Sequence, residues 1–310
     1  MSAPTGFLAR VGLEPAGPDR WSAAAGGTER MALGLLGAQA MVAAGRTVDT
    51  RWRWVHAVHV TRLDEGAPET DERIPEPAVL HQVERTHDTP VRSVRLVRSV
   101  QQDTPVALTT VTFAAPQPGP GPSHQRAAAV DDVVPPGALA PAGAGSFLDV
   151  RHLDRARCQR PDEPQSPAAP TRMWTRVTEE IPDQILLHAA ALTMAADLLL
   201  VELPTTEDAT QDATQDATQD ATREWADLEA GRGLRAVPLD LSIRIHRGFR
   251  ADDWMLHGHE SVSAADYRAL TTGWFVSPAG RLVASVSQET GLLQAAEPRP
   301  APVTAVCTTP

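Results

Sequence analysis

The segment at residues 282–289 alternates apolar and polar side chains in a way typical of a β-strand. Successive side chains of a strand point to opposite faces, and Leu282, Ala284 and Val286 share one face. Three apolar residues on one face predict that this face is turned toward a core. Gln288 continues the same face, and burying its amide is costly unless another group pairs with it. The pattern therefore predicts an inward glutamine that requires a polar partner.

The order of hydrophobic segments repeats along the chain. The first copy has a predicted helix at 31–46, followed by strand candidates at 54–63, 77–86, 91–100 and 105–116. The second copy has a strand candidate at 173–180 and a predicted helix at 182–199, followed by strand candidates at 240–249, 253–263, 268–277 and 281–290. Each copy is thus one long apolar helix followed by antiparallel strands, which predicts an α+β layer arrangement.

Residue identities support an internal duplication. A shift of 176 positions without gaps superposes Leu80, His81, Glu84, Arg92 and Val100 on Leu256, His257, Glu260, Arg268 and Val276. Together with the repeated order of elements, these five identities favour two copies of one ancestral unit.

Charge and composition change the picture mainly by exclusion. The chain has 310 residues, and its formal net charge of −11 argues against a nucleic-acid partner. Residues 205–230 hold eight acidic residues and one arginine, and they include four Asp-Ala-Thr units at a period of four. This segment is poor in residues that can be buried, so we expect an acidic disordered loop, with a specific docking tail as the alternative.

Neither export nor membrane insertion is predicted. Cys158 and Cys307 lie far apart, which supports neither a disulfide framework nor a cysteine metal site. The N-terminus lacks the pattern of an export signal. The longest apolar run, residues 185–203, is interrupted by polar residues and is typical of a buried helix. We therefore expect a soluble, cytoplasmic protein without a membrane partner.

Common catalytic and cofactor motifs are missing from the sequence. It has no nucleophile elbow, no dinucleotide-binding glycine motif, no P-loop and no H-E-x-x-H zinc motif. In HGHE at residues 257–260 two histidines share one strand face, but a metal site would need further ligands. We expect ordinary strand histidines there, with no metal and no cofactor.

Asp197 is the most unusual charged residue of the chain. It follows Leu186, Ala190 and Thr193 along one stripe of the second predicted helix, in almost wholly apolar surroundings. A carboxylate there would be desolvated and its pKa raised, unless polar partners reach it. Gln288 is a candidate partner. The alternative is that Asp197 ends the helix and points to water.

Longer motifs resemble a known family. The stretches DDWMLHGHESVSAA and GWFVSPAGRLVASVSQE, with WVHAVHVTRL and LGLLGAQAMVAA in the first half, are similar to those of the acyl-CoA thioesterase II family. The resemblance covers nearly the whole chain outside the linker and the acidic insertion. It implies a double hotdog, in which two long central helices are each wrapped by a curved antiparallel sheet.

The composition of the chain and the repeated order of its elements predict domain boundaries. We expect an N-terminal hotdog at 1–135, a linker rich in Pro, Ala and Gly at 136–170, and a C-terminal hotdog at 171–293. The C-terminal hotdog would contain the acidic insertion at 205–230, and a flexible tail would follow at 294–310.

The family's chemistry implies three site residues that orient one water molecule. They are an Asp near the end of the second central helix, a Gln in the last strand, and a Thr or Ser at the start of a strand. The first two correspond to Asp197 and Gln288. The hydroxyl position falls on Pro238, which supplies neither a hydroxyl nor an N–H. Ser242 is a possible substitute, and a backbone N–H near the second central helix could stabilise the oxyanion.

The resemblance implies a hydrolase of lipid metabolism, which we expect to be cytoplasmic. It would cleave acyl-CoA or acyl-carrier-protein thioesters to free acid and thiol by water attack that Asp197 and Gln288 direct. The alternative is a non-hydrolytic acyl-binding protein, or a pathway-specific enzyme that acts on a carrier-bound polyketide-like chain; Pro238 favours this alternative. A homo-oligomer is possible in either case.

Overall fold

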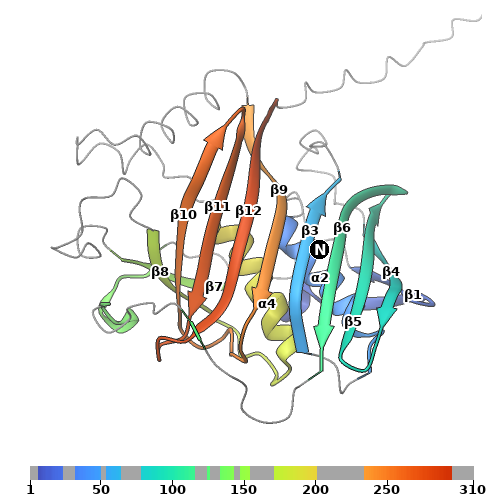
Figure 1. Cartoon of the computed structure of the whole chain (residues 1–310), viewed down its shortest axis with the longest axis horizontal. Coiled ribbons are helices and arrows are strands. Elements are labelled where there is room, and N and C mark those ends of the chain that lie inside the picture. The colour runs from blue at the N-terminus through green and yellow to red at the C-terminus, as the bar shows by residue number, and fades with distance from the viewer. Residues whose placement is uncertain are drawn as a thin grey trace, which may run out of the picture.

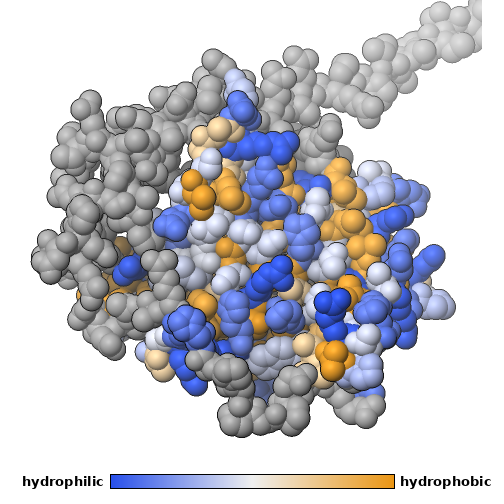
Figure 2. All heavy atoms as spheres, in the orientation of Figure 1, coloured by the Kyte–Doolittle hydropathy of each residue, from blue (hydrophilic) through white to orange (hydrophobic). Residues whose placement is uncertain are grey.

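One antiparallel sheet organises the described part of the chain. The computed structural model describes residues 6–23, 32–49, 54–63, 78–115, 124–125, 133–142, 147–153, 171–200 and 234–294. The twelve strands lie in the order β1-β2-β4-β5-β6-β3-β9-β12-β11-β10-β8-β7. Two helices, α2 and α4, pack together behind this sheet (Figure 1). The opposite face of the sheet exposes a mixture of hydrophilic and hydrophobic residues (Figure 2).

The first half of the chain supplies one side of the sheet. Its elements are α1 (Phe7–Arg10), β1 (Leu13–Gly17), β2 (Arg20–Ala23), α2 (Leu33–Gly45), β3 (Trp54–Arg62), β4 (Val79–Asp88), β5 (Arg92–Gln101) and β6 (Thr104–Ala114). The predicted helix and the four predicted strands of this half are all present. The short strands β1 and β2 were not predicted.

The second half supplies the other side. Its elements are the short 3-10 helix η2 (Pro136–Ala138), β7 (Leu148–His152), β8 (Thr171–Val177), α4 (Ile185–Leu200), β9 (Leu234–Ile245), β10 (Met255–Ala265), β11 (Arg268–Val276) and β12 (Leu282–Gln294). All the predicted elements of this half are present as well. Strand β7 lies within the stretch that was predicted to be a linker, and it pairs with β8.

The two halves share one sheet, whereas the sequence predicts a separate sheet for each helix. Strands β3 and β9 pair antiparallel, from Ala57 opposite Arg244 to Thr61 opposite Asp240. An unpaired strand edge leaves backbone N–H and C=O groups without partners. Pairing β3 with β9 joins the two edges and makes the sheet continuous. The segment 205–230 and residues 295–310 lie outside the described residues, and the predicted domain boundaries stay predictions.

The central helices are buried on nearly all sides. In α2 only Leu35 is not buried, and in α4 most side chains are buried as well. A helix that is apolar all round is typical of a core. Within the described residues, none of the helices has the combined length and apolar character needed to cross a membrane.

Glycines allow α2 and α4 to approach closely. A Cβ atom added at Gly34 would lie 2.5 Å from the Cβ of Asp197 and 2.8 Å from the carbonyl oxygen of Thr193. A Cβ at Gly45 would collide with the side chain of Leu186. The second residue of each helix therefore meets the thirteenth residue of the other, which means that the helices run antiparallel.

We expect Gly34→Ala to destabilise the protein, although alanine favours helix formation. The added methyl group would force α2 and α4 apart, and overpacking of this kind costs about 1–3 kcal/mol. Gly137→Ala is the matched control, because nothing lies within 4 Å of the added Cβ there. Thermal unfolding of both variants checks this, and equal midpoints for the two would contradict the close approach.

Candidate functional site

Asp197 and Gln288 meet in the interior, as the sequence analysis expected of a buried pair. The Gln288 Nε2–H donates to Asp197 Oδ1 at 2.7 Å. The Asp197 side chain is 3% exposed and the Gln288 side chain 0% exposed. The inward face of β12 therefore delivers the amide to the carboxylate of α4, and the alternative that Asp197 points to water is wrong.

The second oxygen of the carboxylate is held by the other helix. The Gly34 backbone N–H donates to Asp197 Oδ2 at 2.8 Å. Gly34 is the second residue of α2, and the first N–H groups of a helix have no partner within the helix. They also form its positive end, which favours a nearby negative charge. Asp197 of α4 therefore accepts a hydrogen bond from an N–H group at the N-terminus of α2 that has no partner within α2.

Burial and these partners act on the charge of Asp197 in opposite directions. Burial raises the pKa of Asp197, while the Gly34 N–H, the Arg62 guanidinium and the Gln288 amide each offset part of the rise. Arg62 lies at the end of β3 and donates from its Nε–H to the Pro238 carbonyl at 2.9 Å. The net result is a carboxyl group whose pKa is above its ordinary value, and whose ionised form is a stronger base than one in water.

Gln288 retains hydrogen-bonding capacity beyond this pair. Its Oε1 atom is buried, and no group of the described residues donates to it. An amide oxygen can accept two hydrogen bonds, and a buried acceptor without a donor is costly. The Asp197–Gln288 pair can therefore accept further hydrogen bonds from a small donor such as water.

The structure does not bring Ser242 to this pair. A bulge between Glu289 and Thr290 leaves Leu239 without a partner residue on β12, so the alternation of β9 is reversed beyond it. Ser242 pairs with Ser287 on the outer face of the sheet. Its hydroxyl lies 2.6 Å from His59 Nδ1 in an exposed position. Strand alternation counted from Pro238 gave the wrong face because sequence alone does not reveal the bulge.

Thr290 lies on the inward face instead. It is opposite Pro238 in the sheet and two residues beyond Gln288 on the same face of β12. The Thr290 side chain is 6% exposed. Within the described residues no hydrogen bond of its hydroxyl is recorded. Sequence patterns do not single out Thr290 or Gly34, because their relevance depends on the bulge and on the contact between the helices.

The two histidines of the HGHE motif, His257 and His259, are accounted for by hydrogen bonds within the sheet. His257 Nδ1–H donates to the Trp274 carbonyl at 3.2 Å, and His257 Nε2 accepts from His259 Nδ1–H at 3.2 Å. Burial lowers the pKa of His257 to about 3, so the ring is neutral at pH 7. No group of three or more metal-ligating side chains is assembled in the described part of the chain.

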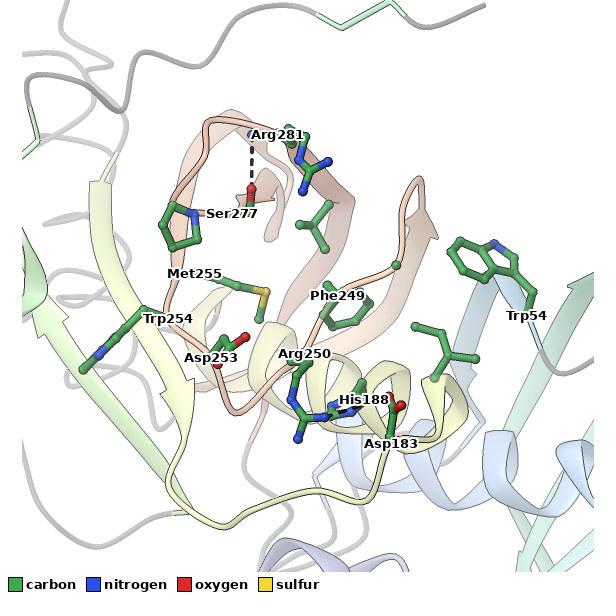
Figure 3. Close-up of a pocket in the computed structure, with 14 residues that line it drawn as sticks. Trp54, Asp183, His188, Phe249, Arg250, Asp253, Trp254, Met255, Ser277 and Arg281 are labelled. Atoms are coloured by element: carbon green, nitrogen blue, oxygen red, sulfur yellow. Dashed lines mark hydrogen bonds and ion pairs between the residues drawn. The ribbon is translucent and has the colours of Figure 1, made fainter. Parts of the chain in front are cut away.

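A cavity of about 460 Å³ lies at the opposite end of α4 from Asp197 (Figure 3). Its lining includes Ile185 and His188 of α4. Asp197 lies twelve residues beyond Ile185, which is about 18 Å along a helix axis. The cavity and the Asp197–Gln288 pair are therefore separate places in the fold.

Comparisons with known proteins agree with this architecture. Residues 141–292 match the family model described as acyl-CoA thioesterase C-terminal domain. Acyl-coenzyme A thioesterase 8 of Homo sapiens is 26% identical over 284 residues, which cover 84% of this chain and 80% of that protein. The solved structure of the acyl-CoA thioesterase II TesB2 from Mycobacterium marinum has a TM-score of 0.70 and 28% identity, and the match covers 95% of this chain and 99% of that one.

A shorter match has higher identity. Over 66 residues the chain is 38% identical to acyl-CoA thioesterase 2 of Haemophilus influenzae, which is 21% of this chain and only 23% of the length of that relative. The antiparallel sheet that packs on buried central helices places the molecule in the hotdog class. Within that class, the chain is similar to acyl-CoA thioesterases II, and its residues 141–292 match the model of the acyl-CoA thioesterase C-terminal domain.

We expect Asp197→Asn to raise the stability of the folded protein at neutral pH. Because the folded-state pKa of Asp197 lies above its unfolded value near 3.8, the cost of ionising Asp197 in the fold is absent below that value and grows as the pH rises toward the folded pKa. Asparagine removes this cost, and its amide can donate to Gln288 Oε1. The gain is about 1 kcal/mol.

Thermal unfolding at pH 7 and at pH 4 measures the effect. The midpoint of Asp197→Asn should exceed that of the wild type at pH 7, and the difference should shrink at pH 4. Glu260→Gln, at an exposed position of β10, is the control for loss of a negative charge. A lower midpoint for Asp197→Asn at pH 7 would contradict the conclusion that ionised Asp197 destabilises the fold.

Proposed function

We propose that the protein hydrolyses acyl thioesters by water attack that Asp197 and Gln288 direct. The observation that carries this proposal is the buried hydrogen bond of 2.7 Å between the two side chains. Acyl-CoA is the substrate class that the names of the relatives support. Each central helix with its half of the sheet would form one hotdog unit of a double hotdog, with the boundaries that the sequence predicts.

The proposed reaction places water between the pair and the thioester. One O–H group of the water points to Asp197, and the other donates a hydrogen bond to Gln288 Oε1. No described residue donates to this oxygen. As the water oxygen bonds to the carbonyl carbon, the Asp197 carboxylate takes the first proton. The carbon–sulfur bond then breaks, and the leaving thiolate takes that proton back from Asp197.

The first turn of α2 supports the developing negative charge. The sequence analysis expected an oxyanion donor near the second central helix, but the helix end beside Asp197 is the N-terminus of α2. Backbone N–H groups at a helix N-terminus stabilise an anion. We infer that this helix end contributes to oxyanion stabilisation, in addition to its hydrogen bond with Asp197.

Thr290 supplies the hydroxyl that Pro238 lacks. The family pattern places a Thr or Ser at the position of Pro238, and Thr290 is the residue opposite Pro238 on β12. Residues opposite each other in a sheet project to the same side and are neighbours. The hydroxyl would thus lie on β12 instead of on the neighbouring strand β9. Along β12 it would be about 7 Å from Gln288.

One observation favours the second candidate function, a non-hydrolytic acyl-binding protein. Both oxygens of Asp197 already accept a hydrogen bond, from Gln288 and from Gly34. A carboxylate oxygen has a further acceptor site, so water can still bind. If the pair stays closed on itself when an acyl chain is present, the same site would bind the ligand without cleaving it.

We expect Asp197→Asn to lower the rate of thiol release from acyl-CoA by roughly a hundredfold or more, because asparagine cannot accept the proton. The assay offers acyl-CoA and acyl-carrier-protein substrates of several chain lengths and follows free thiol. The stability measurement above confirms that the variant is folded. Unchanged release would show that Asp197 is not the base. Binding of acyl-CoA without release by the wild type would favour the second candidate.

Removal of the Thr290 hydroxyl should lower kcat more than it changes KM. Thr290→Val keeps the shape and should reduce kcat roughly tenfold or more, as expected when a hydrogen bond made in the transition state is lost. Thr290→Ser should retain most of the rate. In the Thr290→Val background, Pro238→Thr should restore part of it. Wild-type kinetics for Thr290→Val would overturn the proposed role.

A further inference from the structure

The two ends of the helix pair are related by the internal duplication. At one end, Gly34, the second residue of α2, contacts Asp197, the thirteenth residue of α4. At the other end, Leu186, the second residue of α4, contacts Gly45, the thirteenth residue of α2. The same helix positions thus meet twice, and we call the place where Leu186 meets Gly45 the second crossing.

The second crossing lacks the carboxylate of the first. Gly45 stands where Asp197 stands in the other pairing, so the partner helix offers the N-terminus of α4 no acidic group. A helix of sixteen residues such as α4 has a positive N-terminal end with free N–H groups. The side chain of Leu186 fills the contact with Gly45, so an anion from outside the chain would approach this helix end from the cavity beside Ile185 and His188.

A cavity opens at this N-terminus. Its volume of about 460 Å³ lies within the usual size range of small-molecule sites. The lining combines residues of α4 with the segment between β9 and β10 and the hairpin between β11 and β12 (Figure 3). Trp54 and Phe249 contribute aromatic surface to it, whereas the ring of Trp254, which also lines the cavity, is covered by the guanidinium groups of Arg151 and Arg176 at 5.0 and 4.6 Å. Flat aromatic surfaces in a partly polar cavity suit a planar ring.

His188 adds a buried donor without a partner. The side chain lines the cavity and is only 1% exposed. Its Nδ1 accepts the Ala251 backbone N–H at 3.1 Å, so the proton of the neutral ring is on Nε2. Burial lowers the pKa of His188, which keeps the ring neutral. No group of the described residues accepts a hydrogen bond from Nε2, so the ring has a donor to offer a ligand.

The charged residues of the cavity divide into paired and unpaired groups. Arg250 is held by Asp252 at 2.7 Å and lies 3.9 Å from Asp183. Arg281 lines the cavity, and within the described residues its guanidinium takes part in no recorded hydrogen bond or ion pair. Asp253 and Asp183 are the carboxylates of the lining. The cavity therefore offers a free cation as well as acceptors for hydroxyl groups.

We propose that this cavity binds an adenine nucleotide. The aromatic side chains contact the base, and the carboxylates of Asp183 and Asp253 accept hydrogen bonds from the ribose hydroxyls. The phosphate groups lie near the N-terminus of α4 and Arg281, and His188 Nε2–H donates to the ligand. Free ADP and the nucleotide part of CoA share this chemistry. The site is separate from the Asp197–Gln288 pair, so it does not depend on the proposed hydrolysis.

Calorimetric titration of the full-length protein with ADP, CoA and adenosine tests the proposal. We expect saturable binding of ADP to the wild type and unchanged binding to Asp197→Asn. Adenosine, which lacks phosphate, should bind at least tenfold more weakly. Equal affinities for ADP and CoA would assign the site to the shared nucleotide. Tighter binding of CoA that Asp197→Asn does not alter would assign it to the larger ligand.

Two cavity variants give the proposal its sharpest test. Arg281→Ala removes an exposed cation, and His188→Asn removes the Nε2 donor while its amide oxygen can still accept the Ala251 N–H. Each should weaken ADP binding at least tenfold, and Arg98→Ala, on the exposed side of β5, should leave it unchanged. Equal ADP affinity in the wild type and Arg281→Ala, or no saturable ADP binding at all, would overturn the proposal whether or not the enzyme releases thiol.

Discussion

The close approach of α2 and α4 is the constraint on which the site depends. The carboxylate of Asp197 reaches the Gly34 N–H only because the second residue of α2 has no side chain. The same carboxylate is then within reach of Gln288 on β12. A buried charge is tolerated only when its surroundings supply hydrogen bonds or opposite charge. Helix contact, strand register and carboxylate burial are therefore parts of one arrangement.

The continuous sheet fixes that arrangement. Strand β9 pairs with β3 on one side and with β12 on the other. Because β3 carries Arg62 and β12 carries Gln288, pairing of the two halves brings both groups to the side of Asp197. A single half of the chain supplies either α2 and Arg62 or Asp197 and Gln288. The candidate site is therefore formed by both halves of the chain, and neither half contains it alone.

The sequence predicts what depends on local pattern. Both central helices follow from their apolar composition and the long strands from alternation, and the meeting of Asp197 with Gln288 follows from one inward face and one apolar helix. The single sheet was not predicted, because hydrophobic alternation does not say which strand edges pair. The wrong placement of Ser242 has a similar cause, since the bulge at Leu239 leaves no mark in the alternation of β9. Gly34 and Thr290 gain their roles only from contacts between distant segments.

The asymmetry between the two helix ends explains how one duplicated fold can separate two tasks. At the first crossing a carboxylate of the chain itself accepts a hydrogen bond from the helix N-terminus, and burial raises its pKa, as the proposed role of a proton acceptor requires. At the second crossing glycine takes that position, so α2 offers this helix end no carboxylate, as the proposed anion site requires. A carboxylate at the second crossing would compete with such a ligand. A glycine at the first would remove the base. On both proposals, the residue at the thirteenth position of each helix distinguishes the end that would do acid–base chemistry from the end that would bind an anion.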